Sequence, residues 1–124
     1  MQTTIKNKIE LEGKGLHTGC ITKMIFLPEK PNTGIRFRRI DLKKKPYVHA
    51  CITNVHNTQR RTVLKENEAL VETVEHVLAA IFALGINNLT IELNGPEIPI
   101  LDGSAKIFIN KLEKTGIKIQ EEAK

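Results

Sequence analysis

Apolar and polar residues alternate in several short stretches of the first half of the chain. This period of two is typical of strands with one buried face. Turn residues bound these stretches: Gly13 and Gly15 follow the first, Pro28 ends the second, and residues 31–34 (PNTG) precede the third. The pattern predicts strands over residues 2–12, 20–27, 35–40 and 47–55, and a further short strand over residues 59–64.

The period changes after residue 72. Residues 73–84 (TVEHVLAAIFAL) predict a helix with Thr73 as its N-cap and Gly85 just beyond its end. No charged residue occurs between residues 77 and 84, so this helix is apolar on nearly all sides and needs burial on more than one face. Because the sheet of one small domain covers only one face, we expect something else to cover the other.

The second half of the chain mixes strands with a second helix. The pattern predicts a strand over 88–93, an extended segment over 97–101 that contains two prolines, a helix over 105–115 and a last strand over 117–120. Ser104 is the expected cap of this helix and Gly116 its end. Strands first, then helices among strands, predict an α+β fold: a single domain with a mostly antiparallel sheet layered with two helices on one face. We expect the domain to span residues 1–120, with the polar residues 121–124 as a linker stub.

The composition is that of an ordinary globular domain. Of 124 residues, 40% are hydrophobic and 27% are charged. No apolar stretch approaches the roughly 18 residues of a membrane span, and the N-terminus has charge but no apolar core of a signal peptide. We therefore expect a cytoplasmic protein that does not span a membrane. The two cysteines, Cys20 and Cys51, lie in alternating stretches and are predicted to be buried free thiols.

Charge is distributed unevenly along the chain. Residues 1–65 hold 14 Lys/Arg and 4 Asp/Glu, whereas residues 66–124 hold 5 and 10. A basic face attracts anions such as a nucleotide diphosphate or a nucleic acid, but on charge alone a solvated strand surface is the better interpretation. The basic residues 36–45 show no recognition-helix pattern, so we expect no nucleic-acid partner.

The strongest candidate chemistry is the pair Glu75-His76 in the first turn of the apolar helix. Adjacent helical positions point roughly 100° apart, so the two side chains can flank one reacting centre. A neutral histidine is a good zinc ligand, and a nearby carboxylate can deprotonate a metal-bound water. Position 79 is Ala79, so the helix supplies one histidine only. The residues alone favour the plainer alternative, a glutamate at a helix start beside a surface histidine; His49 and His56 are expected to be structural or solvated.

Two further segments are candidates for lining a site. His17 lies among three glycines in residues 13–19, which suggests an irregular backbone that approaches something closely. A simple bend between strands is an equal alternative, since neither phosphate-binding glycine spacing is present. Arg60, Arg61 and Thr62 come just before the helix; their plain alternative is a solvated strand end.

Four segments in order give the sequence a family resemblance: residues 15–19 (GLHTG), 73–80 (TVEHVLAA), 85–88 (GINN) and 96–105 (PEIPILDGSA). Together they resemble the UDP-3-O-acyl-N-acetylglucosamine deacetylase family, which commits the pathway to lipid A, over essentially the whole chain. The resemblance implies a bacterial, cytoplasmic, zinc-dependent amidohydrolase that acts on a UDP-linked acyl amino sugar. It also implies two domains of like α+β topology whose helices pack together around the active site.

The resemblance also assigns residues. His76 would be a zinc ligand and Glu75 the general base; His17 would lie near the site, and residues 59–62, with Arg60, Arg61 and Thr62, would line the region around the acetyl group. The family's C-terminal domain supplies the remaining zinc ligands and the general acid. We therefore expect this chain to be the N-terminal half, inactive by itself, with residues 121–124 leading toward a missing C-terminal domain.

The sequence allows one alternative function and makes one prediction about assembly. One alternative is a non-catalytic binding or interaction module that uses the same fold and receives a partner on the apolar helix. The other concerns assembly, because an uncovered apolar face on helix 73–84 predicts self-association of the isolated chain, for instance as a two-fold dimer.

Overall fold

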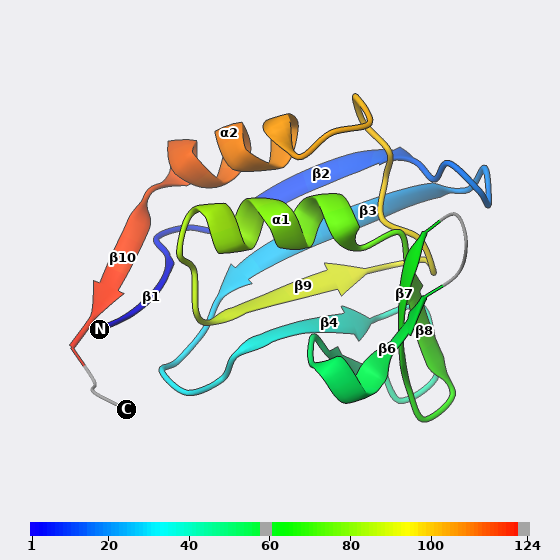
Figure 1. The fold of residues 1–124 in the computed structure, drawn as a ribbon, viewed down its shortest axis with the longest axis horizontal. Helices are drawn as coiled ribbons and strands as arrows, with labels where there is room; N and C mark the ends of the chain where they lie inside the picture. The colour runs from blue at the N-terminus through cyan, green and yellow to red at the C-terminus, as the bar shows by residue number, and fades with distance from the viewer. Residues whose placement is uncertain (58–60, 122–124) are drawn as a thin grey trace.

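The computed structural model of the chain describes residues 1–57 and 61–121. The elements, in chain order, are β1 (Gln2–Ile5), β2 (Ile9–Lys14), β3 (Ile21–Pro28), β4 (Ile35–Arg39), β5 (Tyr47–His49), a 3₁₀ turn (Ile52–Asn54), β6 (Val55–Asn57), β7 (Thr62–Glu66), β8 (Ala69–Glu72), α1 (Glu75–Ala83), β9 (Leu89–Leu93), α2 (Lys106–Thr115) and β10 (Ile117–Gln120). Figure 1 shows their arrangement. The α+β class predicted from the sequence is confirmed.

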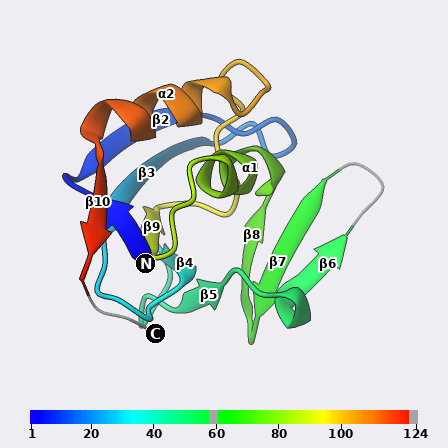
Figure 2. The ribbon, with the colours of Figure 1, turned by 60° about the vertical axis from the view of Figure 1, so that its left-hand side comes forward.

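The strands form three sheets rather than the one that we expected. The main sheet has the order β2-β3-β9-β4-β5, with antiparallel neighbours except for the parallel pair β4–β9. β1 and β10 pair antiparallel and bring the two ends of the domain together (Figure 1). β6, β7 and β8 form a separate antiparallel sheet at the far end of the molecule (Figure 2). This small sheet directly precedes α1, so it places the start of that helix.

Both helices lie side by side on one face of the main sheet (Figures 1 and 2), as predicted. Alternate residues of the strands point into this layer, which follows from the period of two along a strand. Each fully buried apolar side chain contributes about 2 kcal/mol relative to exposure. The large side chains of this core include Met24, Phe26, Phe37, Ile81, Leu89, Ile91, Leu93, Phe108 and Leu112, all at most 1% exposed.

One face of α1 is uncovered, as the apolar sequence predicted. Val77, Ala80 and Ile81 face the core, whereas Phe82 is 68% exposed on the opposite side. Ala79, one turn before Phe82, is also exposed. An apolar hollow adjoins this face and is lined by Ala50, Cys51, Ile52, Val55, Leu64, Leu78 and Phe82. The uncovered face is therefore continuous with apolar surface from the 3₁₀ turn and β6.

The predicted strand over residues 2–12 is wrong as a single element. It divides into β1 and β2, which belong to different sheets, because the polar residues 6–8 are exposed and turn the chain. The predicted strand over 47–55 likewise breaks after His49. Cys51 and Cys20 are exposed rather than buried, since both lie at strand ends where the alternation no longer faces the core.

The start of α1 also differs from expectation. Val74, not Thr73, occupies the N-cap position, and no side-chain capping bond forms. Thr73 instead adopts a positive φ of 61°, and its hydroxyl donates a hydrogen bond to Glu97. The end of α1 is as predicted, with Gly85 at φ 68°. At α2, the predicted Ser104 hydroxyl accepts a hydrogen bond from the Lys106 N–H, although Ala105 is the N-cap residue.

Candidate functional site

Glu75 and His76 form the first turn of α1, and both side chains are half-buried. The Oε1 atom of Glu75 accepts a hydrogen bond from the backbone N–H of Thr62 at 3.2 Å. The carbonyl of Thr62 in turn accepts hydrogen bonds from the N–H of Thr73 at 2.9 Å and of Val74 at 3.3 Å. The first residue of β7 thus fixes both the helix start and one carboxylate oxygen of Glu75.

Arg61 precedes Thr62 at this junction between β7 and the start of α1, and its side chain is held by an ion pair. Its Nη2 atom is 2.8 Å from Oε1 of Glu72, the last residue of β8. The Arg61 side chain is 26% exposed and that of Glu72 is 15% exposed, so solvent screens the pair only in part. Arg60, the neighbouring candidate, lies outside the described residues. The structure therefore brings Thr62 and Arg61 to the start of α1.

The His17 loop is linked to the residue before this helix start through Glu97. Glu97, which is 0% exposed, accepts hydrogen bonds from the N–H of His17 at 3.1 and 3.2 Å and from the N–H of Thr18 at 2.9 Å. Its Oε2 atom also accepts the hydroxyl hydrogen of Thr73 at 2.6 Å. The backbone of the loop faces inward while the His17 side chain is exposed. His17 therefore stands on a loop whose backbone is fixed.

Opposing effects determine the charge of Glu97. Burial raises its pKa, while the hydrogen bonds from Thr73 and from the backbone N–H groups of Thr18 and His17 lower it. The hydrogen bonds prevail, and the pKa lies below the ordinary value of 4.5. Glu97 is thus a buried carboxylate at neutral pH whose charge is satisfied by polar hydrogens.

The segment 96–101 (PEIPIL) stands out in the sequence, but its pattern predicts no role for Glu97. The signal that marks this residue is an acidic residue within an otherwise apolar extended stretch, since a buried charge requires partners. Its partners are 79 or 80 residues away in the His17 loop and 24 residues away at Thr73. Pattern along the chain does not reveal contacts of such separation.

His49 lies away from this junction and is structural, in keeping with the sequence interpretation. Its Nδ1 atom is 3.0 Å from Oε1 of Glu66, which also accepts its backbone N–H at 2.8 Å. These two hydrogen bonds are the leading causes of the lowered pKa of Glu66. The pair joins β5 to the last residue of β7.

The basic residues of β4 are engaged within the domain. Arg36 pairs with Glu29 at 3.3 Å, and Arg39 binds both carboxylate oxygens of Asp41 at 2.9 and 2.7 Å. The guanidinium of Arg36 also lies 4.0 Å from the centre of the Tyr47 ring. This part of the basic half is therefore an internally paired sheet surface.

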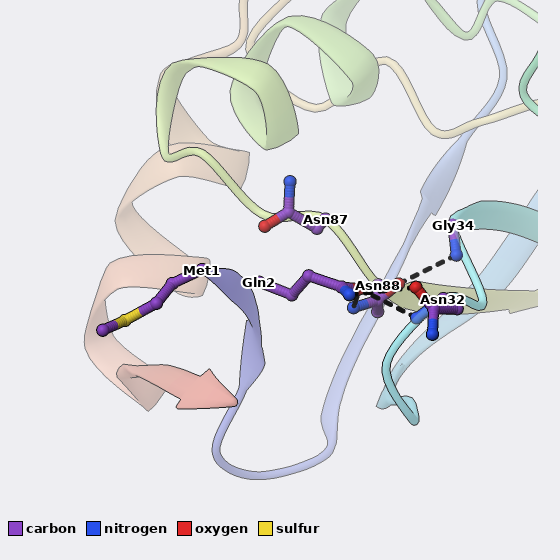
Figure 3. Close-up of a pocket in the computed structure, with 6 residues that line it drawn as sticks. All are labelled: Met1, Gln2, Asn32, Gly34, Asn87 and Asn88. Atoms are coloured by element: carbon purple, nitrogen blue, oxygen red, sulfur yellow. Dashed lines mark hydrogen bonds between the residues drawn. The ribbon is translucent and has the colours of Figure 1, made fainter. Parts of the chain in front are cut away.

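A second hollow lies near the chain's N-terminus, close to the end of α1 that is opposite Glu75. Figure 3 shows its lining, formed by Met1, Gln2, Asn32, Gly34, Asn87 and Asn88. Its amides bind one another: Asn88 Nδ2 donates to Gln2 Oε1 at 2.9 Å, and Gln2 Nε2 donates to Asn32 Oδ1 at 3.0 Å. These groups fasten β1 to the main sheet, and the hollow is not the candidate site.

The described residues do not make a complete metal site. Within residues 1–57 and 61–121, no three His, Cys, Asp or Glu side chains gather closely enough to hold a metal ion. His76 and the adjacent Glu75 fit one part of such a site, a nitrogen donor beside a carboxylate. In the same part of the chain, no helix has the length and apolar character needed to cross a membrane.

Comparison with known proteins decides the family. The sequence matches the model of the LpxC family, UDP-3-O-acyl N-acetylglycosamine deacetylase, over residues 2–124. The chain belongs to this family. It is 46% identical over 123 residues to the bifunctional enzyme LpxC/FabZ of Bacteroides thetaiotaomicron, and 45% identical over 120 residues to that of Porphyromonas gingivalis. It is 39% identical over 123 residues to the UDP-3-O-acyl-N-acetylglucosamine deacetylase of Citrifermentans bemidjiense.

The match covers this chain almost completely but its relatives only in part. It includes 97–99% of this chain, and 27%, 26% and 40% of the three relatives respectively. The chain therefore corresponds to less than half the length of these deacetylases, and its site residues are those of one segment of the family.

Proposed function

We propose that this chain is the N-terminal half of a zinc-dependent deacetylase that hydrolyses the N-acetyl group of a UDP-3-O-acyl-N-acetylglucosamine, the committed step of lipid A biosynthesis. The observation that carries the proposal is the placement of Glu75 and His76. In a chain of this family, they form a carboxylate–imidazole pair at the half-buried start of a helix whose outer face is uncovered.

Glu75 acts as the general base in this proposal. The N–H of Thr62 orients one of its oxygens, and the carboxylate accepts a proton from the attacking water. His76 is a ligand for zinc, with further donors coming from outside the described residues. When bound, zinc polarises the amide carbonyl and lowers the pKa of water.

Four residues line the site around this pair in the proposal. Thr62 and Arg61 lie at the helix start, His17 projects from its anchored loop, and Arg60 is the neighbour of Arg61 in the sequence. His17, Arg60 and Arg61 add hydrogen-bond donors near a substrate whose diphosphate is anionic. We place this chemistry in the cytoplasm and assign no nucleic-acid partner.

The proposed domain spans residues 1–120 and works together with a second domain of the same protein. With one of the three protein ligands that a catalytic zinc site normally has, the chain alone is inactive in this account. The short share of each relative that the chain matches supports this view.

A chimera tests the proposed function. Residues 1–121 of this chain replace the matching segment of the Citrifermentans bemidjiense deacetylase, and acetate release from UDP-3-O-acyl-N-acetylglucosamine is measured. The proposal predicts activity for the chimera and none for the chain alone. A folded, zinc-loaded chimera that releases no acetate would contradict it.

A non-catalytic interaction module is the second candidate, favoured by the uncovered face of α1. Phe82 and the adjoining apolar hollow form a surface suited to a protein partner. The two candidates differ in whether Glu75 and His76 matter, since a binding module retains its function when both are replaced.

The isolated chain is expected to self-associate through this face, because association removes exposed apolar area from water. Light scattering should show a concentration-dependent dimer, and Phe82→Ser should shift it toward monomer. Ile21→Ser is the matched control: Ile21 is also 68% exposed, but it is the first residue of β3 and not part of α1 or of the adjoining hollow. A strictly monomeric chain at high concentration, or equal effects of both substitutions, would contradict this expectation.

A further inference from the structure

A buried carboxylate joins three segments that meet at the start of α1. Glu97 lies in the extended segment after β9, His17 and Thr18 lie in the loop between β2 and β3, and Thr73 connects β8 to α1. None of these contacts is local in sequence. Each segment is therefore placed relative to the others by the side chain of Glu97.

We propose that Glu97 is a positioning residue that fixes the His17 loop against the start of α1. A series of hydrogen bonds runs from the N–H groups of His17 and Thr18 through the Glu97 carboxylate to the hydroxyl of Thr73. It continues from the N–H of Thr73 to the carbonyl of Thr62, whose own N–H binds Glu75.

The backbone around Glu97 reinforces this placement. The N–H of Glu72 donates to the carbonyl of Pro96 at 2.7 Å, and the N–H of Ile98 donates to the carbonyl of Glu72 at 3.0 Å. Glu97 is thus held between two backbone hydrogen bonds to the residue that precedes Thr73. These bonds restrict the movement of the Glu97 carboxylate, so the position of the His17 loop depends on that of the carboxylate.

The His17 loop is shaped to receive this carboxylate. Gly15 is buried, and a Cβ atom placed there would overlap Oε1 of Glu97. The N–H of Gly15 binds the carbonyl of Cys20, and the N–H of Gly19 binds the carbonyl of Gly15. The loop closes on itself and directs the two N–H groups of His17 and Thr18 at Glu97.

The inference rests on the proposed function only where it assigns His17 and Glu75 to one site; the anchoring itself does not depend on catalysis. The experiment therefore measures backbone amide exchange in this chain by NMR. In the wild-type chain the amides of His17 and Thr18 should exchange at least about tenfold more slowly than in an unstructured peptide, as hydrogen-bonded groups do. Exchange at the unstructured rate would overturn the proposal.

Thr73→Val removes one donor to the carboxylate while keeping the shape of the side chain. Because hydrogen bonds to charged groups are the stronger ones, it should accelerate exchange at His17 and Thr18 by about tenfold or more. Thr73→Ser should restore slow exchange. Core amides such as Phe26 and Ile91 should exchange as in the wild type.

Thr22→Val is the matched control, because Thr22 is 0% exposed and its hydroxyl has no partner within the described residues. It should leave the loop amides unchanged, as should Glu75→Gln. Unchanged loop exchange in Thr73→Val, or equal acceleration of core and loop amides, would overturn the assignment. Because this readout needs no substrate, an inactive chimera with a protected His17 loop would contradict the proposed function alone.

Discussion

Replacing Glu75 with glutamine in the active chimera is expected to lower the deacetylase turnover number by at least about a hundredfold, the usual contribution of a general base. Glutamine keeps the size of the side chain and a carbonyl oxygen for the Thr62 N–H. It cannot accept the proton of the attacking water. The expected loss is therefore in turnover, with thermal unfolding of the variant close to that of the parent.

The control for this variant is Glu113→Gln, which changes an exposed glutamate on α2 in the same way. It should retain the parent's turnover. Parental activity in Glu75→Gln would contradict the assignment of Glu75 as the general base.

The Gly15→Ala substitution is expected to have the largest effect on stability, about 3 kcal/mol in the free energy of unfolding, at the upper end of ordinary overpacking. The new methyl group would approach both Oε1 of Glu97 and, at 2.8 Å, the hydroxyl of Thr18. Glu97 cannot move aside without giving up hydrogen bonds to a buried charge. Urea unfolding of the isolated chain measures the loss.

A second glycine in the same loop separates this steric effect from backbone strain. Gly19 has φ 71°, but a Cβ atom placed there meets nothing within 4 Å. Gly19→Ala should therefore lower the free energy of unfolding by only about 1 kcal/mol, the cost of placing alanine in the left-handed conformation. Equal losses for the two variants would show that Glu97 does not crowd Gly15.

Sequence pattern predicted the second half of the fold better than the first. The helix over 73–84 and the strand over 88–93 have strong periods and clear ends, and both lie close to the observed α1 and β9. In residues 2–12 the alternating pattern continues across a bend, so the sequence predicted one strand where the structure has two, β1 and β2. The short strand β8 was missed because four residues after a turn give too little pattern.

In the candidate site, contacts between neighbouring residues could be predicted from the sequence, whereas contacts between distant residues could not. Glu75 and His76 are adjacent, so sequence alone could select them as a pair. Glu97 acts through residues up to 80 positions away, and only the folded chain places it beside His17 and Thr73. Thr73 likewise has a positive φ and donates its hydroxyl hydrogen to the distant Glu97 instead of capping α1, so the predicted N-cap was wrong.

Zinc titration calorimetry tests the proposal that this chain holds one part of a zinc site shared with a second domain. The isolated chain, the chimera, and the chimera with His76→Ala are titrated under the same conditions. We expect tight binding by the chimera only, with at least a tenfold loss of zinc affinity in His76→Ala, because one histidine does not hold zinc alone. Tight binding by the isolated chain, or unchanged binding by His76→Ala, would contradict it.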